Sequence, residues 1–161
     1  MINIINPWLW LVPVAGLLLI LLLWRFYGLG RHIQAGRARE SFRLQHERLE
    51  KLFLEKASAA GTPRGLRWIG CVFGEEAEFA RERKTGLVVA LVGVTINFEA
   101  IEGGDMEGLP AVSLPRMGSA VLHFVRGQWT TLGRAIFNLG PHEVLDHFAS
   151  EYEPIHSAHH S

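Results

Sequence analysis

The chain has 161 residues, in which 16 lysine and arginine side chains balance 16 aspartates and glutamates. From residue 65 onward, 12 acidic residues outnumber 7 basic ones, which argues against nucleic acid as a partner because phosphate binding needs clustered positive charge. A single cysteine, Cys71, excludes an internal disulfide bond. It lies in an apolar stretch, so we expect a buried and inert thiol.

An uncharged run at the N-terminus, from Pro7 to Trp24, predicts a transmembrane anchor within residues 1–30. Its 18 residues would be roughly 27 Å long as a helix, close to the ~30 Å hydrocarbon core of a bilayer. No positively charged segment precedes the run and no cleavage site follows it, which argues against a secretory signal peptide. Residues typical of membrane interfaces lie at its two ends: Trp8, Trp10, Trp24, Arg25, Phe26 and Tyr27.

The distribution of positive charge predicts the orientation of this anchor. Residues 25–64 carry nine basic and four acidic side chains, whereas no lysine or arginine precedes residue 25. Because the basic side of a span stays in the cytoplasm, we expect the N-terminus outside the inner (cytoplasmic) membrane and the C-terminal domain in the cytoplasm. Membrane lipid is therefore an expected partner.

Residues 31–62 are predicted to form a juxtamembrane amphipathic helix, with its regular part from Ala38 to Ala59. This pattern fits a helix that covers the sheet of the following domain. It also fits a helix that associates with a second copy or lies on the membrane surface. A basic cluster near the membrane is a candidate docking site for anionic lipid or a partner: Arg37, Arg39 and Arg43.

Residues 63–153 are predicted to form a small cytoplasmic domain that begins with two strands and a turn at residues 84–86. The strongest strand covers Leu87 to Glu99, with Val94, Ile96 and Phe98 on one face. Shorter strands are expected over residues 66–73, 77–82, 120–125, 128–131 and 135–139, a helix over 141–150, and a flexible tail over 154–161. Trp68 and Trp129 are expected to pack in the core.

This order of elements predicts an α+β domain, with a curved antiparallel sheet and helices on one side or end. Two architectures fit, namely an NTF2- or cystatin-like roll and a pleckstrin-homology-like barrel. The long bent strand favours the roll, whereas the closing C-terminal helix favours the barrel.

Three segments resemble an uncharacterised family of small bacterial membrane-anchored proteins. They are PRGLRW at 63–68, VTINFEAIEGGDMEG at 94–108 and WTTLGRAIFNLGPHE at 129–143. The resemblance covers most of residues 60 to 150 and implies a single domain. It implies no activity and no functional residues.

Two clusters of polar residues are candidate ligand sites by composition. His142 and His147 are five residues apart, so on a helix they point about 140° away from each other, unlike the histidines of the H-E-x-x-H zinc motif. We therefore expect no metal site there. The acidic loop with Glu102, Asp105 and Glu107 does not match the EF-hand spacing, and we regard it as a candidate docking surface for a basic partner.

The sequence contains no P-loop, no GxGxxG, no CxxC and no Ser–His–Asp set that would indicate catalysis. We therefore expect a non-catalytic protein without a cofactor. The predicted function is a single-pass accessory or adaptor subunit that docks a small domain on a membrane protein complex, or that associates with itself through the juxtamembrane helix. The alternative is a membrane-tethered domain that binds a ligand or a lipid.

Overall fold

The computed structural model describes residues 8–61 and 65–155, and it describes no side chains for residues 8–12 and 24–34. The chain divides into two units, residues 1–36 and 37–161, and each is described by itself. The described helices are α1 (Trp8–Leu44), α2 (His46–Ala60), the 3-10 helix η1 (Pro110–Ser113) and α3 (Pro141–His147). The predicted α+β class is confirmed.

In the part of the chain that the structure describes, no helix has a stretch that is both long and apolar enough to cross a membrane. The predicted anchor from Pro7 to Trp24 lies partly outside the described residues, because Pro7 is not described and residues 8–12 and 24 have no described side chains. The same holds for the side chains of the predicted membrane interface: Trp8, Trp10, Trp24, Arg25, Phe26 and Tyr27.

The amphipathic pattern over residues 38–59 is present as the end of α1 followed by α2, with a break at Gln45. Gln45 leaves helical geometry at φ −116° and ψ 12°. Apolar residues on both sides of the break are buried against the sheet, namely Phe42, Leu49 and Phe53.

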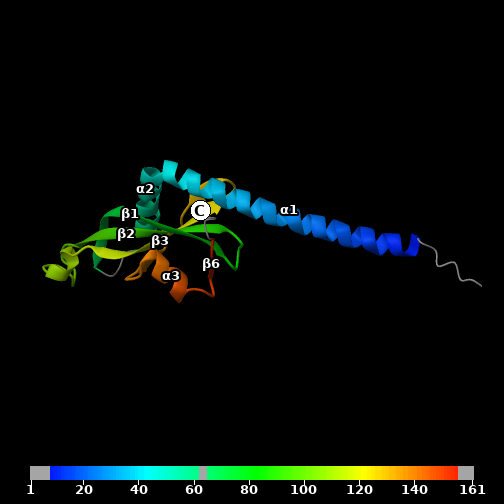
Figure 1. Ribbon diagram of the computed structural model, residues 1–161. Helices are drawn as coiled ribbons and strands as arrows, with labels where there is room; N and C mark the ends of the chain where they lie inside the picture. Colours follow the sequence, from blue (N-terminus) through cyan, green and yellow to red (C-terminus); the bar gives the residue numbers. More distant parts are fainter. Residues whose placement is uncertain (1–7, 62–64, 156–161) are drawn as a thin grey trace, which may run out of the picture. The chain divides into compact units, whose positions relative to one another are not determined.

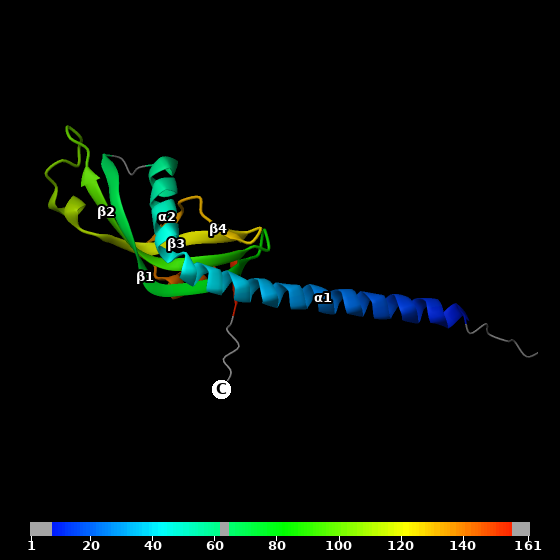
Figure 2. The same cartoon turned by 90° about the horizontal axis from the view of Figure 1, so that it is seen from above.

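The sheet is antiparallel and curved (Figures 1 and 2), with strand order β4-β3-β2-β1-β6, while β5 also pairs with β3. Its strands are β1 (Leu66–Glu82), β2 (Val88–Ala100), β3 (Arg116–Val125), β4 (Gln128–Thr130), β5 (Ala135–Phe137) and β6 (Tyr152–Pro154). The predicted hairpin is present, because β1 and β2 pair from Leu66 with Ala100 to Arg81 with Val88.

The two strands expected over residues 66–73 and 77–82 are one continuous strand, β1. Its register with β2 shifts between Phe73 and Ala77, where extra residues lie opposite Gly93. This irregularity bends the strand, and it explains why the alternation of side chains in the sequence is interrupted there. At this point the carboxylate of Glu50 in α2 accepts a hydrogen bond of 2.8 Å from the backbone N–H of Phe73.

Helices cover both faces of the sheet, which corrects the expectation of helices on one side or end. One face packs against residues 38–57 of α1 and α2, and the other packs against α3; Figure 1 shows α2 and α3 on opposite faces. The physical reason is the run Val88–Val92 of β2, in which every residue is fully buried. Alternate residues of this run need apolar cover on opposite faces.

Candidate functional site

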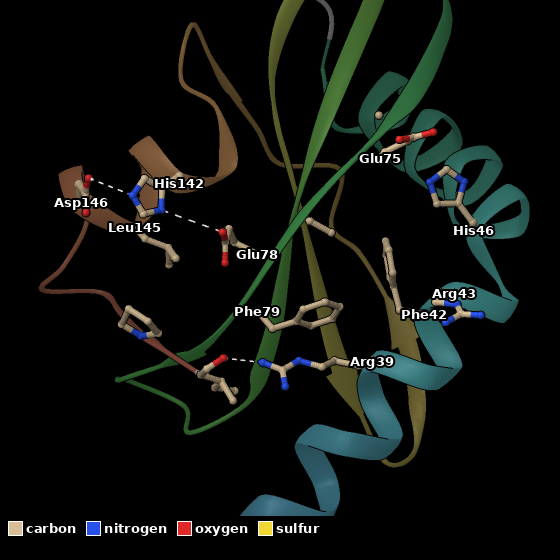
Figure 3. A pocket seen from close by; sticks show the side chains of 14 residues that line it. Arg39, Phe42, Arg43, His46, Glu75, Glu78, Phe79, His142, Leu145 and Asp146 are labelled. Carbon is tan, nitrogen blue, oxygen red and sulfur yellow. Dashed lines mark hydrogen bonds and ion pairs between the residues drawn. The ribbon is translucent and has the colours of Figure 1, made fainter. Parts of the chain in front are cut away.

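A groove of about 980 Å³ lies beside the free edge of β1. β6 pairs with β1 only from Ala80 to Glu82, so the edge from Gly74 to Phe79 has no strand beside it among the described residues. The edge forms the base of the groove, and helices form its two walls (Figure 3). The residues of the two walls are far apart in the sequence. Both walls pack against the β1–β2 hairpin.

The first wall consists of the end of α1 and the start of α2, with Arg39, Phe42, Arg43 and His46. The guanidinium of Arg39 lies over the ring of Phe79, 5.3 Å from its centroid, and its Nη2 donates a hydrogen bond to the carbonyl oxygen of Ile155. Arg39 is thus fixed by two contacts within the domain. Arg43 also lines the groove, and it makes no hydrogen bond or ion pair with the other described residues.

The second wall consists of α3 and a carboxylate of β1. Nδ1 of His142 lies 4.0 Å from Oε1 of Glu78, and Nε2 of His142 lies 3.9 Å from Oδ2 of Asp146. The side chains of His142, Glu78 and Asp146 are 79%, 46% and 76% exposed, so these contacts are solvated and weak. Leu145 contributes the apolar part of this wall.

An aromatic cluster lies beneath the first wall of the groove. Phe42 packs edge-to-face against Phe79 and Trp129, with ring centroids 5.7 and 5.6 Å apart. Trp129 is buried, as expected, and its Nε1–H donates a hydrogen bond of 3.0 Å to the carbonyl oxygen of Ala38. The cluster thereby ties the end of α1 to β1 and β4.

Two further polar residues of α3, Glu143 and His147, make contacts close to the helix itself. The Oε2 of Glu143 accepts a hydrogen bond of 2.6 Å from the N–H of Gly140 and so caps the helix N-terminus. The ring of His147 packs against Phe148, 5.0 Å away. Within residues 8–61 and 65–155, no group of three or more histidine, cysteine, aspartate or glutamate side chains is arranged to hold a metal ion.

The predicted docking residues do not converge on one place. Arg39 and Arg43 line the groove, and Arg37 is exposed nearby in the sequence. The acidic loop lies at the other end of the β1–β2 hairpin, after Ala100. Its residues Glu102, Asp105 and Glu107 are exposed, and Oε2 of Glu107 accepts a hydrogen bond of 2.8 Å from the N–H of Gly103.

Sequence reasoning missed an exposed apolar row on the sheet face that carries α3. Register places Val72 of β1, Thr95 of β2 and Met117 of β3 side by side, and Val72 and Met117 are 59% and 71% exposed. Ile69, 55% exposed, lies near one end of the row. Cavities of about 480 and 490 Å³ flank the row, one beside the loop that carries Met106 and the other beside α3.

A second exposed apolar region is the helical stretch within residues 13–23. Its large side chains are 51–63% exposed, and they occupy all sides of the helix: Val14, Leu17, Leu18, Leu19, Ile20, Leu21, Leu22 and Leu23. A helix that is apolar all round is normally covered by protein or by lipid.

Cys71 is buried, as expected from its apolar neighbours. Burial, with a smaller contribution from the charge of Glu50, raises the pKa of its thiol to about 11. Its Sγ donates a weak hydrogen bond of 3.6 Å to the carbonyl oxygen of Glu50. Because the thiolate is the reactive form, this cysteine is a poor nucleophile at neutral pH.

Comparisons with protein-family models, with curated proteins and with solved structures find no match to this chain.

Proposed function

We propose that the chain is a single-pass membrane-anchored accessory or adaptor subunit, whose α+β domain docks on a membrane protein complex. The observation that carries the proposal is the helical stretch within residues 13–23, whose large apolar side chains are 51–63% exposed. Leaving this much apolar surface in water is unfavourable by about 25 cal/mol per Å². A bilayer removes all sides of such a helix from water at once.

The placement in the membrane rests on the sequence around this stretch. The uncharged run from Pro7 to Trp24 sets its length, and the nine basic residues of 25–64 set its direction. The N-terminus is thereby outside the inner membrane, and the domain is in the cytoplasm. Arg37 and Arg43, which make no hydrogen bond or ion pair with other described residues, are available to anionic lipid or to a partner.

The exposed apolar row supports docking of the domain. Val72, Met117 and Ile69 form an apolar strip on a sheet face that α3 covers only in part. Monomeric proteins rarely expose contiguous apolar surface of large size, and such surface commonly marks a protein interface. The acidic loop with Glu102, Asp105 and Glu107 provides charge for a basic rim of the partner surface.

The finer architecture that we propose is the roll rather than the barrel. The strand order places β4 and β6 at opposite edges of the sheet, and a closed barrel would pair its two edges. An open curved sheet offers a face for a partner, as the proposed adaptor role requires.

The anchor is tested by fractionation of membranes that contain the full chain. The wild-type protein is expected to stay in the membrane pellet after alkaline carbonate treatment and to need detergent for release. Leu18→Arg combined with Leu21→Arg is expected to move most of the protein to the supernatant, because each central arginine costs about 2.5–3.5 kcal/mol of insertion. Leu132→Arg is the control, since Leu132 is 78% exposed on the domain. Wild-type protein in the soluble fraction would contradict the anchor.

Docking is tested by native electrophoresis of the detergent extract from the protein's own host membranes. Wild-type protein is expected to migrate in an assembly larger than its own micelle. Val72→Asp with Met117→Asp is expected to release it from this assembly, because two charges would be buried without partners. The control is again Leu132, here as Leu132→Asp. Migration of wild-type protein at its own micelle size would refute the accessory-subunit role.

The alternative function, binding of a ligand or lipid, would use the groove beside β1. Its volume of about 980 Å³ is at the upper end of ordinary ligand sites. Its rim carries charges of both signs and its base is a strand edge, which suits a polypeptide better than a compact ligand.

A further inference from the structure

The edge of β1 beside the groove presents backbone groups with which no described strand pairs. The N–H of Ile155 donates a hydrogen bond of 2.9 Å to the carbonyl oxygen of Phe79, so this carbonyl faces the edge. Backbone groups alternate along a strand, and Ala77, two residues earlier, therefore directs its N–H and C=O to the same edge. β6 pairs with β1 only from Ala80 to Glu82, and the groove follows the stretch that this pairing leaves open.

The residue after β6 shows which side chains suit the α1 and α2 side of this edge. Ile155 lies opposite Phe79, and both pack with Ala77 against the core cluster on that side of the sheet. A residue added opposite Ala77 would project to the same side, because directly opposed residues of an antiparallel pair share a face. It would meet Ala77 and Phe42, which line the groove, so an apolar side chain fits this position.

The alternate positions of an added strand would project to the α3 side, where the groove is acidic (Figure 3). Carboxylate oxygens of Glu78 and Asp146 lie 4.0 and 3.9 Å from the two ring nitrogens of His142. A protonated His142 balances only one of these two charges, and a neutral imidazole balances neither. A lysine or arginine opposite Glu78 would supply the missing positive charge.

We propose that the groove binds an extended segment of a partner protein, which adds to the edge of β1 as an antiparallel strand. The segment alternates apolar residues, which face α1 and α2, with lysine or arginine, which face Glu78 and Asp146. Backbone hydrogen bonds give such added strands affinity, and alternate side chains give them specificity. Neither Val72 nor Met117 lines the groove, so this partner segment is additional to docking through the exposed apolar row.

Charge argues against a second copy of this chain as the occupant. Two β1 edges paired antiparallel about Ala77 would set Glu78 of each copy opposite Glu76 of the other. Like charges directly opposite each other destabilise a sheet, and symmetry would repeat this contact twice. A segment with lysine or arginine opposite Glu78 replaces the repulsion with attraction.

Titration of a labelled peptide with the full chain in nonionic detergent tests the charge requirement. The probe consists of three valine–lysine repeats with blocked ends, and its fluorescence anisotropy reports binding. Glu78→Lys with Asp146→Lys is expected to weaken binding about 10-fold or more, because like charges would then face each other. Glu102→Lys with Asp105→Lys, the control, changes the net charge equally at the acidic loop and is expected to keep most of the affinity. Equal weakening by both pairs, or no binding to wild-type protein, would overturn the proposal.

A matched pair of N-methylated peptides tests the strand pairing. In the proposed register the valine opposite Ala77 directs its N–H to β1, whereas the lysine N–H groups point away from it. Methylation of the valine amides is expected to weaken binding about 10-fold, the effect of one or two lost hydrogen bonds. Methylation of the lysine amides is expected to leave the affinity nearly unchanged. Equal effects of the two methylations would refute the register, and no effect of valine methylation would refute the pairing.

Amide hydrogen exchange locates the bound peptide on the full chain. The amide of Ala77 is expected to exchange about 10-fold more slowly with saturating peptide, because a bound strand protects it. The amide of Leu91, in the centre of the sheet, is expected to keep its rate. An unchanged rate for Ala77 would place the peptide elsewhere and overturn the proposal. Slow exchange of Ala77 without peptide would also overturn it, because the edge would then be covered already.

Discussion

Replacing Trp129 with alanine is expected to lower the free energy of unfolding by about 3–5 kcal/mol, the usual range for a large aromatic side chain in a core. Trp129 is 3% exposed, and its ring contacts those of Phe42, Phe79 and Phe124. Its indole N–H also satisfies the carbonyl of Ala38. The substitution therefore leaves a cavity and removes a buried side-chain hydrogen bond at the junction of α1 with the sheet.

Urea denaturation of the full chain in detergent, followed by circular dichroism, measures this effect. Trp129→Phe is the matched control, since it keeps most of the ring and removes the N–H. We expect a loss of about 0.5–1.5 kcal/mol from the missing hydrogen bond, and a smaller cavity than the alanine variant leaves. A loss below about 1 kcal/mol for Trp129→Ala would contradict the central position of this cluster.

Replacing Gly133 with alanine is expected to destabilise the domain by about 3 kcal/mol or more, or to prevent its folding. Gly133 has φ +77°, and a Cβ at this position would lie 2.5 Å from the Cα of Ala57 in α2. The neighbour is backbone rather than a flexible side chain, so α2 would have to shift away from the sheet. The strain of the backbone conformation adds about 1–2 kcal/mol.

Gly127→Ala separates the two contributions to this effect. Gly127 also has a positive φ, +83°, but a Cβ there would meet nothing within 4 Å. We expect a loss of about 1–2 kcal/mol, which is the conformational strain alone. Equal losses for the two variants, measured by the same urea titration, would show that α2 does not pack closely on Gly133.

The strand pairing could be predicted because it depends on local patterns. Alternating apolar residues placed Val94, Ile96 and Phe98 on one face of β2, and all three are buried in the same core cluster. The turn at residues 84–86 joined β2 to the strand before it, and the structure confirms this hairpin. These features need only the period of a strand and the residue types of a turn.

The residues that cover the α3 side of the sheet could not be predicted from the apolar pattern of β2 alone. The run Val88–Val92 alone indicates that both faces are buried, but it does not say what covers each face. The cover is supplied by Val144 and Leu145 of α3 and by Tyr152. These residues follow β2 by more than 40 positions, and only the fold brings them onto Val89 and Leu91.

The sequence singled out some of the residues that line the groove, but it did not predict the groove itself. Arg39 and Arg43 were recognised as a basic cluster, but their role beside β1 depends on contacts across long sequence separations. Arg39 and Ile155, for example, are 116 positions apart. The exposed row of Val72 and Met117 was missed because an apolar strand residue is equally compatible with a buried face, and register alone decides which faces are covered.

The hydrogen bond between Glu50 and the N–H of Phe73 sets a boundary on how far any added strand can extend along β1. The side chain of Glu50 in α2 already accepts the hydrogen bond from the N–H of Phe73. The backbone of an added strand would therefore find this donor occupied and would meet a negative charge. Replacing Glu50 with a residue that has no carboxylate would free the N–H of Phe73. The unpaired edge of β1 would then be longer by one hydrogen-bonding position. A tendency to form fibres would then arise from a helix substitution, although no strand residue had changed.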